Sequence, residues 1–482
     1  MTLLWATNLF QPSDLPIAAG ACALFLILGF LPARFVALSE RSILLFAILV
    51  AAAPAVLSNW RLASPVTNDD RAYLLQAELF SEGRTSESIP QPAKAWRMRQ
   101  VFEDDSEGIR YAKYPPGTSL ALTPAVAVGQ PWLAALFAGV LDVLLLWAIA
   151  RRLGLQRAAF APLLLVASPF FLLVQTSVQS EIFTFPAALA GYFGLLQARA
   201  TERPRAALAW GALLGGAAGW IFLARPLTGV LFAFACGIGL LGARRRWSAL
   251  SGAIALGLPV AAVLLFFNAH WTGDFLQMPY DLYARRFGPF SRDGAPMDVY
   301  GNGKFFPMLL DQTGRWSVAF AGILGAFMLG FWGLLRLRTR DGGAGLAFAV
   351  LSPLAYAFHW YPGHWSFLGP LYCYESLGLL ICGALALLQD APPRWMRAFL
   401  LTALIAGAFA FTARWRLVTA ESDLRSAPMR VVREQAPPGA VVLLPLSGPN
   451  FNAEYAQKYW TPTRFPKRAD DVVLLYAIAG MS

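Results

Sequence analysis

Apolar runs of about 17 to 20 residues recur along this chain, and that is the length a helix needs to cross the ~30 Å hydrocarbon core of a membrane. Hydrophobic residues make up 57% of the sequence and charged residues only 14%. The sequence therefore predicts an all-α polytopic membrane protein. We expect the first run to remain as a helix, because no basic segment precedes it and no small-residue cleavage site follows it. Twelve spans can be drawn, at 15–33, 42–58, 132–150, 158–175, 181–198, 207–223, 227–243, 248–267, 316–335, 344–359, 367–388 and 398–413.

The basic residues set the orientation of these spans. The net charge is +11, but the arginines lie between apolar segments rather than together on one soluble face, which argues against a nucleic-acid partner. One alternate set of loops carries sixteen arginines against four acids, and the positive-inside rule places this set in the cytoplasm with both termini outside. Its arginines are Arg34, Arg41, Arg151, Arg152, Arg157, Arg199, Arg203, Arg205, Arg244, Arg245, Arg246, Arg336, Arg338, Arg340, Arg394 and Arg397, against the acids Glu40, Glu202, Asp341 and Asp390.

Three segments then lie on the outer side: a first loop at 59–131, a second loop at 268–315 and a tail at 414–482, which follows a transmembrane domain at 1–413. The stretch 118–130 is apolar but short and contains Pro124, so we expect an interfacial or partly re-entrant helix there. The tail has two apolar runs, PPGAVVLLPL and DDVVLLYAIAG, each after a turn signal. They predict two or three strands in a small α/β or β segment.

The cysteines and histidines lack the spacing of a metal site. No CxxC or HxxxH pattern occurs, and the last two histidines are five residues apart across a proline. We therefore expect buried packing cysteines and interfacial histidines. They are Cys22, Cys236, Cys373 and Cys382, and His270, His359 and His364.

The first outer loop carries the adjacent carboxylates Asp69 and Asp70 soon after a span. Tyr73, Ala77 and Phe80 follow at helical spacing, so the pair is predicted to lie at the start of a helix on the outer face. One of residues 68–70 could serve simply as an N-cap. A second carboxylate exceeds what a cap needs, and one of the two could act as a general base while the other orients it or raises its pKa.

The segment NDDRAYLLQAELFSEGR, followed by KYPPGTSLALTPA, resembles the GT-C membrane glycosyltransferases, the superfamily of protein O-mannosyltransferases and bacterial lipid A aminoarabinose transferases. Similar segments continue in order over about residues 60–390: ASPFFLLVQTSVQSEIF, FLARPLTGVLF, TGDFLQMPYDLYARRFGPF and GPLYCYESLGLL. This chain departs from the pattern at Asp70, where glutamate is frequent, at Arg71 directly after the pair, and at Glu181, where many bacterial relatives have histidine. An extra hydrophobic segment also precedes the acidic loop.

The resemblance implies transfer of a sugar from a polyprenyl-phosphate donor to a lipid, glycan or protein acceptor, with inversion, on the outer side of the bacterial inner membrane. Asp69 would be the general base, and Asp70 would orient it or bind the acceptor. Lys113 and Tyr114 of the KYPPG element would lie at the donor phosphate, together with Arg225. A phosphate leaving group needs such cations.

Other residues keep alternative interpretations. Arg225 could instead extend to lipid headgroups from a helix end. Glu181, Tyr73 and Glu375 could contact substrate or a metal, and Glu375 could equally bond to a neighbouring helix. Asp142, near the centre of its span, is expected to pair with another helix. The resemblance leaves a divalent cation open as cofactor.

Two other classes of function fit the sequence. Twelve spans with intramembrane acids also suit a transporter or flippase, although no internal repeat is visible and the large first loop is unexpected there. A non-catalytic membrane scaffold of the same fold is disfavoured by the intact acidic pair. Neither the sugar nor the acceptor is identified by the sequence.

Overall fold

The computed structural model describes residues 14–30, 39–62, 65, 67–91, 98–287, 325–337, 341–358, 370–435, 437, 441–445 and 473–477, with single residues between 305 and 320. Within this part of the chain, six helical segments are long and apolar enough to span a membrane. They are α3 (Glu40–Arg61), α6 (Trp132–Arg152), α10 (Pro204–Ala224), α12 (Arg246–Thr272), η3 with α17 (Leu371–Ser376 and Leu377–Leu388), and α18 (Pro393–Gln435). Shorter or more buried helices complete the bundle: α2 (Asp14–Phe30), α9 (Glu181–Ala200), α11 (Pro226–Leu241), α15 (Ala326–Leu337) and α16 (Gly343–Tyr356). The predicted all-α polytopic membrane fold is confirmed, while the number of twelve spans stays a prediction.

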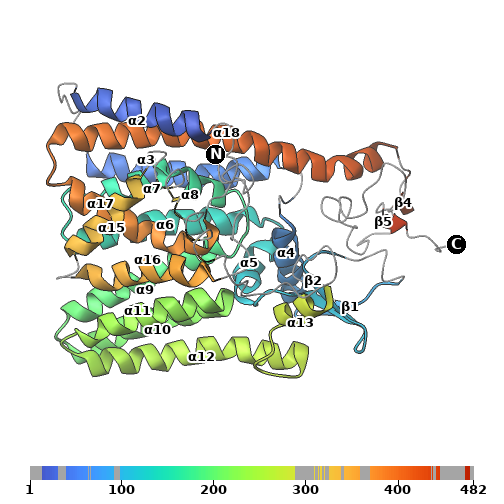
Figure 1. Ribbon diagram of the computed structural model, residues 1–482. Coiled ribbons are helices and arrows are strands. Elements are labelled where there is room, and N and C mark those ends of the chain that lie inside the picture. The colour runs from blue at the N-terminus through green and yellow to red at the C-terminus, as the bar shows by residue number, and fades with distance from the viewer. Residues whose placement is uncertain are drawn as a thin grey trace.

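The long helices lie side by side, and the polar elements gather at one end of them (Figure 1). Helices α2 and α18 run along one flank of the bundle, and α10, α11 and α12 lie on the opposite flank (Figure 1). At the polar end lie α4 (Asn68–Ser81), α5 (Gly117–Ala127), α13 (Pro279–Phe287) and strands β1 (Glu87–Ser88), β2 (Val101–Asp104) and β3 (Ile109–Ala112). Helix α18 continues past the bundle on this same side (Figure 1).

Small residues let α10 and α12 pack backbone against backbone. A Cβ on Gly211 would overlap the carbonyl oxygen of Ala249, and one on Gly215 would overlap that of Ala253. Residues four apart share a helix face, so these glycines form one continuous contact stripe. Close approach of this kind replaces the hydrophobic effect as the force that joins helices inside a membrane.

Ion pairs join several loops at the end of the bundle that carries the arginines assigned to the cytoplasm. Arg199 lies 3.1 Å from Asp341, and Arg152 lies 3.9 Å from the same carboxylate, so the ends of α6 and α9 meet the start of α16. Arg336 contacts Asp390 at 2.6 Å. These residues belong to the set that the arginine distribution assigned to the cytoplasm, and the acidic pair lies at the other end.

The first outer loop folds into a helix on a small sheet. Helix α4 was predicted, but the three-stranded antiparallel sheet of order β1-β3-β2 was not. Its β2–β3 turn passes through Gly108 at a φ of +66°, a conformation that favours glycine. Leu75 and Leu79 of α4 pack with Val101 in a small core of their own. Helix α5 occupies most of the predicted short segment 118–130.

One predicted span is divided in the structure. The span drawn at 158–175 is two helices, α7 (Phe160–Ala167) and α8 (Pro169–Val174). The break lies at Ser168, whose hydroxyl accepts the amide of Phe171 at 3.4 Å, and Pro169 disfavours helical geometry in the residue before it. Within the span drawn at 316–335, helix α15 begins at Ala326, and it ends at Leu337.

The tail also differs from expectation at its start. Helix α18 does not end near residue 413 but continues to Gln435. Strands β4 (Val441–Pro445) and β5 (Val473–Ala477) lie in the two predicted runs and pair in parallel. The extent of the C-terminal segment as a unit stays a prediction. Residues His359 and His364 lie outside the described part of the chain.

Candidate active site

Asp70 is held by backbone amides. Thr67 is the N-cap of α4, a position that the sequence had given to residues 68–70, and its hydroxyl accepts the amide of Asp70 at 2.9 Å. One carboxylate oxygen of Asp70 accepts the Thr67 amide at 3.3 Å, which completes a capping box. The other oxygen accepts the amide of Val178 at 3.4 Å, in the loop before α9. Asp70 is 1% exposed, and burial raises its pKa to about 7.

Asp69 has different surroundings. It is partly accessible, and the hydroxyl of Tyr114 donates a hydrogen bond to its carboxylate. Burial raises the pKa of Asp69, while the positive charges of Lys113, Arg99 and Arg425 oppose this rise. The two neighbouring acids are thus distinct: Asp70 is committed to the backbone, and Asp69 faces polar side chains.

Gln76 places Lys113 beside Asp69. It lies seven residues after Asp69, on the same face of α4. Its side-chain amide donates to the Thr85 carbonyl at 2.8 Å and accepts the Ala112 amide at 3.0 Å. The last residue of β3 is therefore fixed against α4, and the next residue, Lys113, lies near the carboxylate.

Lys113 lies in a cage of tyrosines. Its ammonium group is 4.5 Å from the ring centres of Tyr280 and Tyr283, both on α13, and 5.1 Å from that of Tyr114. Such faces stabilise a cation without neutralising it. The side chain is buried, and burial lowers its pKa to about 7 against the attraction of Asp69. Lys113 therefore changes charge near neutral pH.

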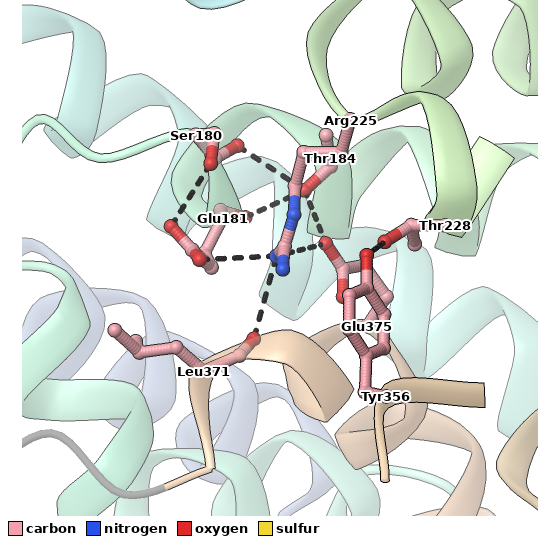
Figure 2. A network of polar contacts seen from close by, with 8 residues as sticks. All are labelled: Ser180, Glu181, Thr184, Arg225, Thr228, Tyr356, Leu371 and Glu375. Carbon is pink, nitrogen blue, oxygen red and sulfur yellow. Dashed lines mark hydrogen bonds and ion pairs between the residues drawn. The ribbon is translucent and has the colours of Figure 1, made fainter. Parts of the chain in front are cut away.

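Arg225 lies at the centre of a buried polar cluster formed by three helix ends (Figure 2). It stands between α10 and α11, where Pro226 begins the second helix. Its Nη1 atom lies 3.0 Å from Glu181, the first residue of α9, and 2.8 Å from Glu375 in η3. The same nitrogen donates to the Leu371 carbonyl at 3.3 Å.

Hydroxyl groups surround this cluster. Thr184 donates to Glu375 and Ser180 to Glu181, at 2.5 and 3.1 Å, and the hydroxyls of Thr228 and Tyr356 lie 2.7 Å apart beside them (Figure 2). One guanidinium faces two carboxylates here. Arg225 is thus engaged within the protein rather than extended towards lipid headgroups.

Tyr73 lies between the two groups of charges. Its ring is 4.8 Å from that of Tyr114, and its hydroxyl hydrogen-bonds with Ser180, the residue before Glu181. It also interacts electrostatically with both Asp69 and Arg225. The structure therefore brings together all eight residues predicted for the site, from α4, the segment after β3, α9, the α10–α11 break and η3.

Sequence reasoning missed Tyr280, Tyr283 and Gln76. The two tyrosines lie in PYDLY, three residues apart and so on one helix face, inside a segment that had been noted only for its resemblance. Gln76 carries no comparable signal. Asp142 pairs with another helix as expected: it accepts from Gln175 at 3.3 Å.

The described side chains lack the groupings that hold metal ions in proteins. Among the residues with described positions, no three His, Cys, Asp or Glu side chains are grouped so that they could hold a metal ion. A divalent cation as cofactor stays a prediction.

Comparison with known proteins rests on structure alone, since neither a family model nor a curated protein sequence matches the chain. The aminoarabinose transferase ArnT from Cupriavidus metallidurans, bound to undecaprenyl phosphate, matches with a TM-score of 0.57 at 14% identity, over 87% of this chain and 85% of that one. Its apo form gives 0.56 at 13% identity, over 86% and 84%. The oligosaccharyltransferase of Archaeoglobus fulgidus gives 0.47 at 15% identity, over 91% and 62%. The resemblance noted in the sequence is confirmed at the level of architecture: the chain has the fold of the GT-C glycosyltransferases.

Proposed function

We propose that this protein is a membrane glycosyltransferase that takes its sugar from a polyprenyl-phosphate donor. The observation that carries this proposal is the partly accessible carboxylate of Asp69 beside the caged ammonium group of Lys113. A base and a cation at the end of a membrane bundle are what sugar transfer from a lipid phosphate requires. Structural similarity to a transferase that binds undecaprenyl phosphate supports the same donor class.

In the proposed reaction, Asp69 removes the proton from an acceptor hydroxyl while that oxygen attacks the anomeric carbon. The bond between this carbon and the phosphate oxygen breaks, and its electron pair leaves with the polyprenyl phosphate. Attack opposite the leaving group inverts the anomeric configuration. The raised pKa of Asp69 suits a base that works near neutral pH.

Lys113 is the cation best placed for the phosphate. Its charge would offset the charge that develops on the leaving group, and Tyr114 would hold Asp69 by its hydrogen bond. Arg225, the other cation predicted for the phosphate, already faces two carboxylates. We assign Asp70 to positioning Asp69, because both of its oxygens accept backbone amides.

The test compares Asp69→Asn with Asp70→Asn. We expect Asp69→Asn to lower transfer about 10²- to 10⁴-fold, the usual effect of losing a general base, with little change in thermal stability. Asp70→Asn, the matched control, should instead destabilise the fold by about 1–3 kcal/mol, because an amide nitrogen would face a buried N–H donor. Mass spectrometry of glycolipids and glycoproteins from cells with and without the protein identifies the product to be followed.

Two results would contradict this assignment. If Asp69→Asn retains more than about a tenth of the activity, Asp69 is not the base. If substrate crosses the membrane without consumption of a donor lipid, the protein is a transporter or flippase.

A further inference from the structure

Arg425, in the part of α18 that follows the last predicted span, contacts the start of α4. Val418, Ser422 and Arg425 lie four and three residues apart, on one helix face, and their exposures are 1%, 0% and 3%. This buried face belongs to the stretch that follows the last predicted span. This face of α18 is therefore covered by other parts of the protein, and Val418 belongs to the core of the bundle.

Arg425 reaches the residue next to the proposed base. Its Nη1 atom donates to the side-chain oxygen of Asn68 at 3.1 Å, and Asn68 directly precedes Asp69. Its Nε atom donates to Glu421, one turn earlier on α18, at 3.0 Å. The guanidinium is thus held between its own helix and the first turn of α4.

A second contact joins the same part of α18 to α3 instead of α4. Arg61, at the end of α3, makes paired hydrogen bonds of 3.1 and 3.0 Å with Asp423. These side chains are 49% and 37% exposed, so their charges are screened by solvent, whereas the Arg425 side chain is fully buried. Of the two arginines, Arg425 is the one whose charge acts at short range on the α4 terminus.

We propose that Arg425 is a positioning residue of the active site, which holds the first turn of α4 and supplies a fixed positive charge beside Asp69. This inference rests on the proposed role of Asp69 as base. It makes the outer half of α18, more than 350 residues away in the chain, a part of the catalytic centre. Loss of this charge should favour the protonated form of Asp69.

Other groups act on Asp69 as well, and the experiment must leave them in place. Burial is the main influence that favours protonation. The facing side chains are Lys113 and Tyr114 after β3, Arg99 before β2, Asp70 and Tyr73 on α4, and Tyr280 on α13.

The experiment is a pH titration of Asp69 in the purified full-length protein by infrared difference spectroscopy. The carboxyl band is assigned by its absence in Asp69→Asn, so no glycosyl donor is needed and the result is independent of the proposed activity. In Arg425→Gln, the band should titrate at higher pH than in the wild type. Arg425→Lys, which keeps the charge, should restore most of the wild-type titration. Arg61→Gln, which breaks the neighbouring exposed pair, should leave the titration unchanged.

Asn68→Ala provides a second variant if Arg425→Gln fails to fold. It removes the acceptor that holds the guanidinium, so the titration should move in the same direction. An unchanged Asp69 titration in whichever of these variants folds would overturn the proposal. An equal shift in Arg61→Gln would also overturn it, because the effect would then come from docking of α18 in general.

Discussion

Lys113 should couple donor binding to the uptake of a proton. Burial lowers its pKa to about 7, so the free protein loses this charge as the pH rises through neutrality. A phosphate beside the ammonium group favours the charged form, which binding therefore restores. The affinity for a lipid phosphate should then fall above pH 7.

The size of this effect follows from the fraction of charged lysine. About half of the molecules carry the charge at pH 7 and about 1% at pH 9, so the apparent Kd should rise roughly 50-fold between these values. The phosphate itself does not contribute over this range, because its second pKa is about 6. The sign is fixed: binding must weaken with rising pH.

The assay is calorimetric titration of the detergent-solubilised protein with undecaprenyl phosphate, in two buffers of different ionisation enthalpy. The difference between buffers gives the number of protons taken up, which should approach one at pH 9 and about one half at pH 7. Lys113→Arg should bind with a flat pH profile, because a guanidinium stays charged. Lys113→Gln should bind weakly at every pH.

A flat profile in the wild-type protein would refute the reasoning about Lys113. It would indicate that a permanently charged group holds the phosphate, and Arg225 would then be the first residue to test. A wild-type slope that persists in Lys113→Arg would point to titration elsewhere in the site.

Two further predictions follow from the buried cluster and from the orientation of the bundle. Arg225→Ala should lower the free energy of unfolding by about 3–5 kcal/mol, because Glu181 and Glu375 would be left buried without their cation. Thermal unfolding should show a lower Tm for this variant, and adding Glu375→Gln should recover part of the loss. An unchanged Tm in Arg225→Ala would contradict the prediction. Single cysteines at the exposed positions Ser88 and Gln156, in a background without the native four, should differ in labelling by an impermeant maleimide. Ser88→Cys should react in cells with intact inner membranes and Gln156→Cys only after lysis, and the reverse result would overturn the arginine-based orientation.

The fold was largely predictable because hydrophobic length and arginine placement act locally along the chain. Each span must be apolar over a fixed length, and each loop carries its own charges. The sheet β1–β3 was harder to foresee, since its strands are two to four residues long and depend on packing against α4. The break at Ser168 was missed because the whole run is apolar and buried. Hydropathy does not distinguish one helix there from two.

The individual residues of the candidate site were predictable from the sequence, but the hydrogen bonds and ion pairs between them were not. Arg225 and Glu181 each stand at the end of a span and could alone be interfacial residues, whereas Glu375 lies two to three turns inside another span and could alone bond to a neighbouring helix. A buried charge must find a partner, so pairing could be expected, yet the choice of partner depends on which helix ends meet. The same limit explains why Asp69 and Asp70 were not distinguished: their roles differ because one accepts the amide of Val178, 108 residues away.

Arg425 marks the point where sequence patterns carry least information. Apolar content ends near residue 413, which suggested the end of a span, but the helix continues to Gln435, and Arg425 on it contacts the first turn of α4. Val418, Ser422 and Arg425 differ too much in polarity to predict a buried face. Arginine is tolerated there because Asn68 and Glu421 accept hydrogen bonds from its Nη1 and Nε atoms, and because the nearby carboxylate of Asp69 offsets the cost of burying its charge. Arg425, the residue that we propose supports Asp69, could therefore not be identified from the sequence, because the composition of residues 414–435 is typical of a surface helix.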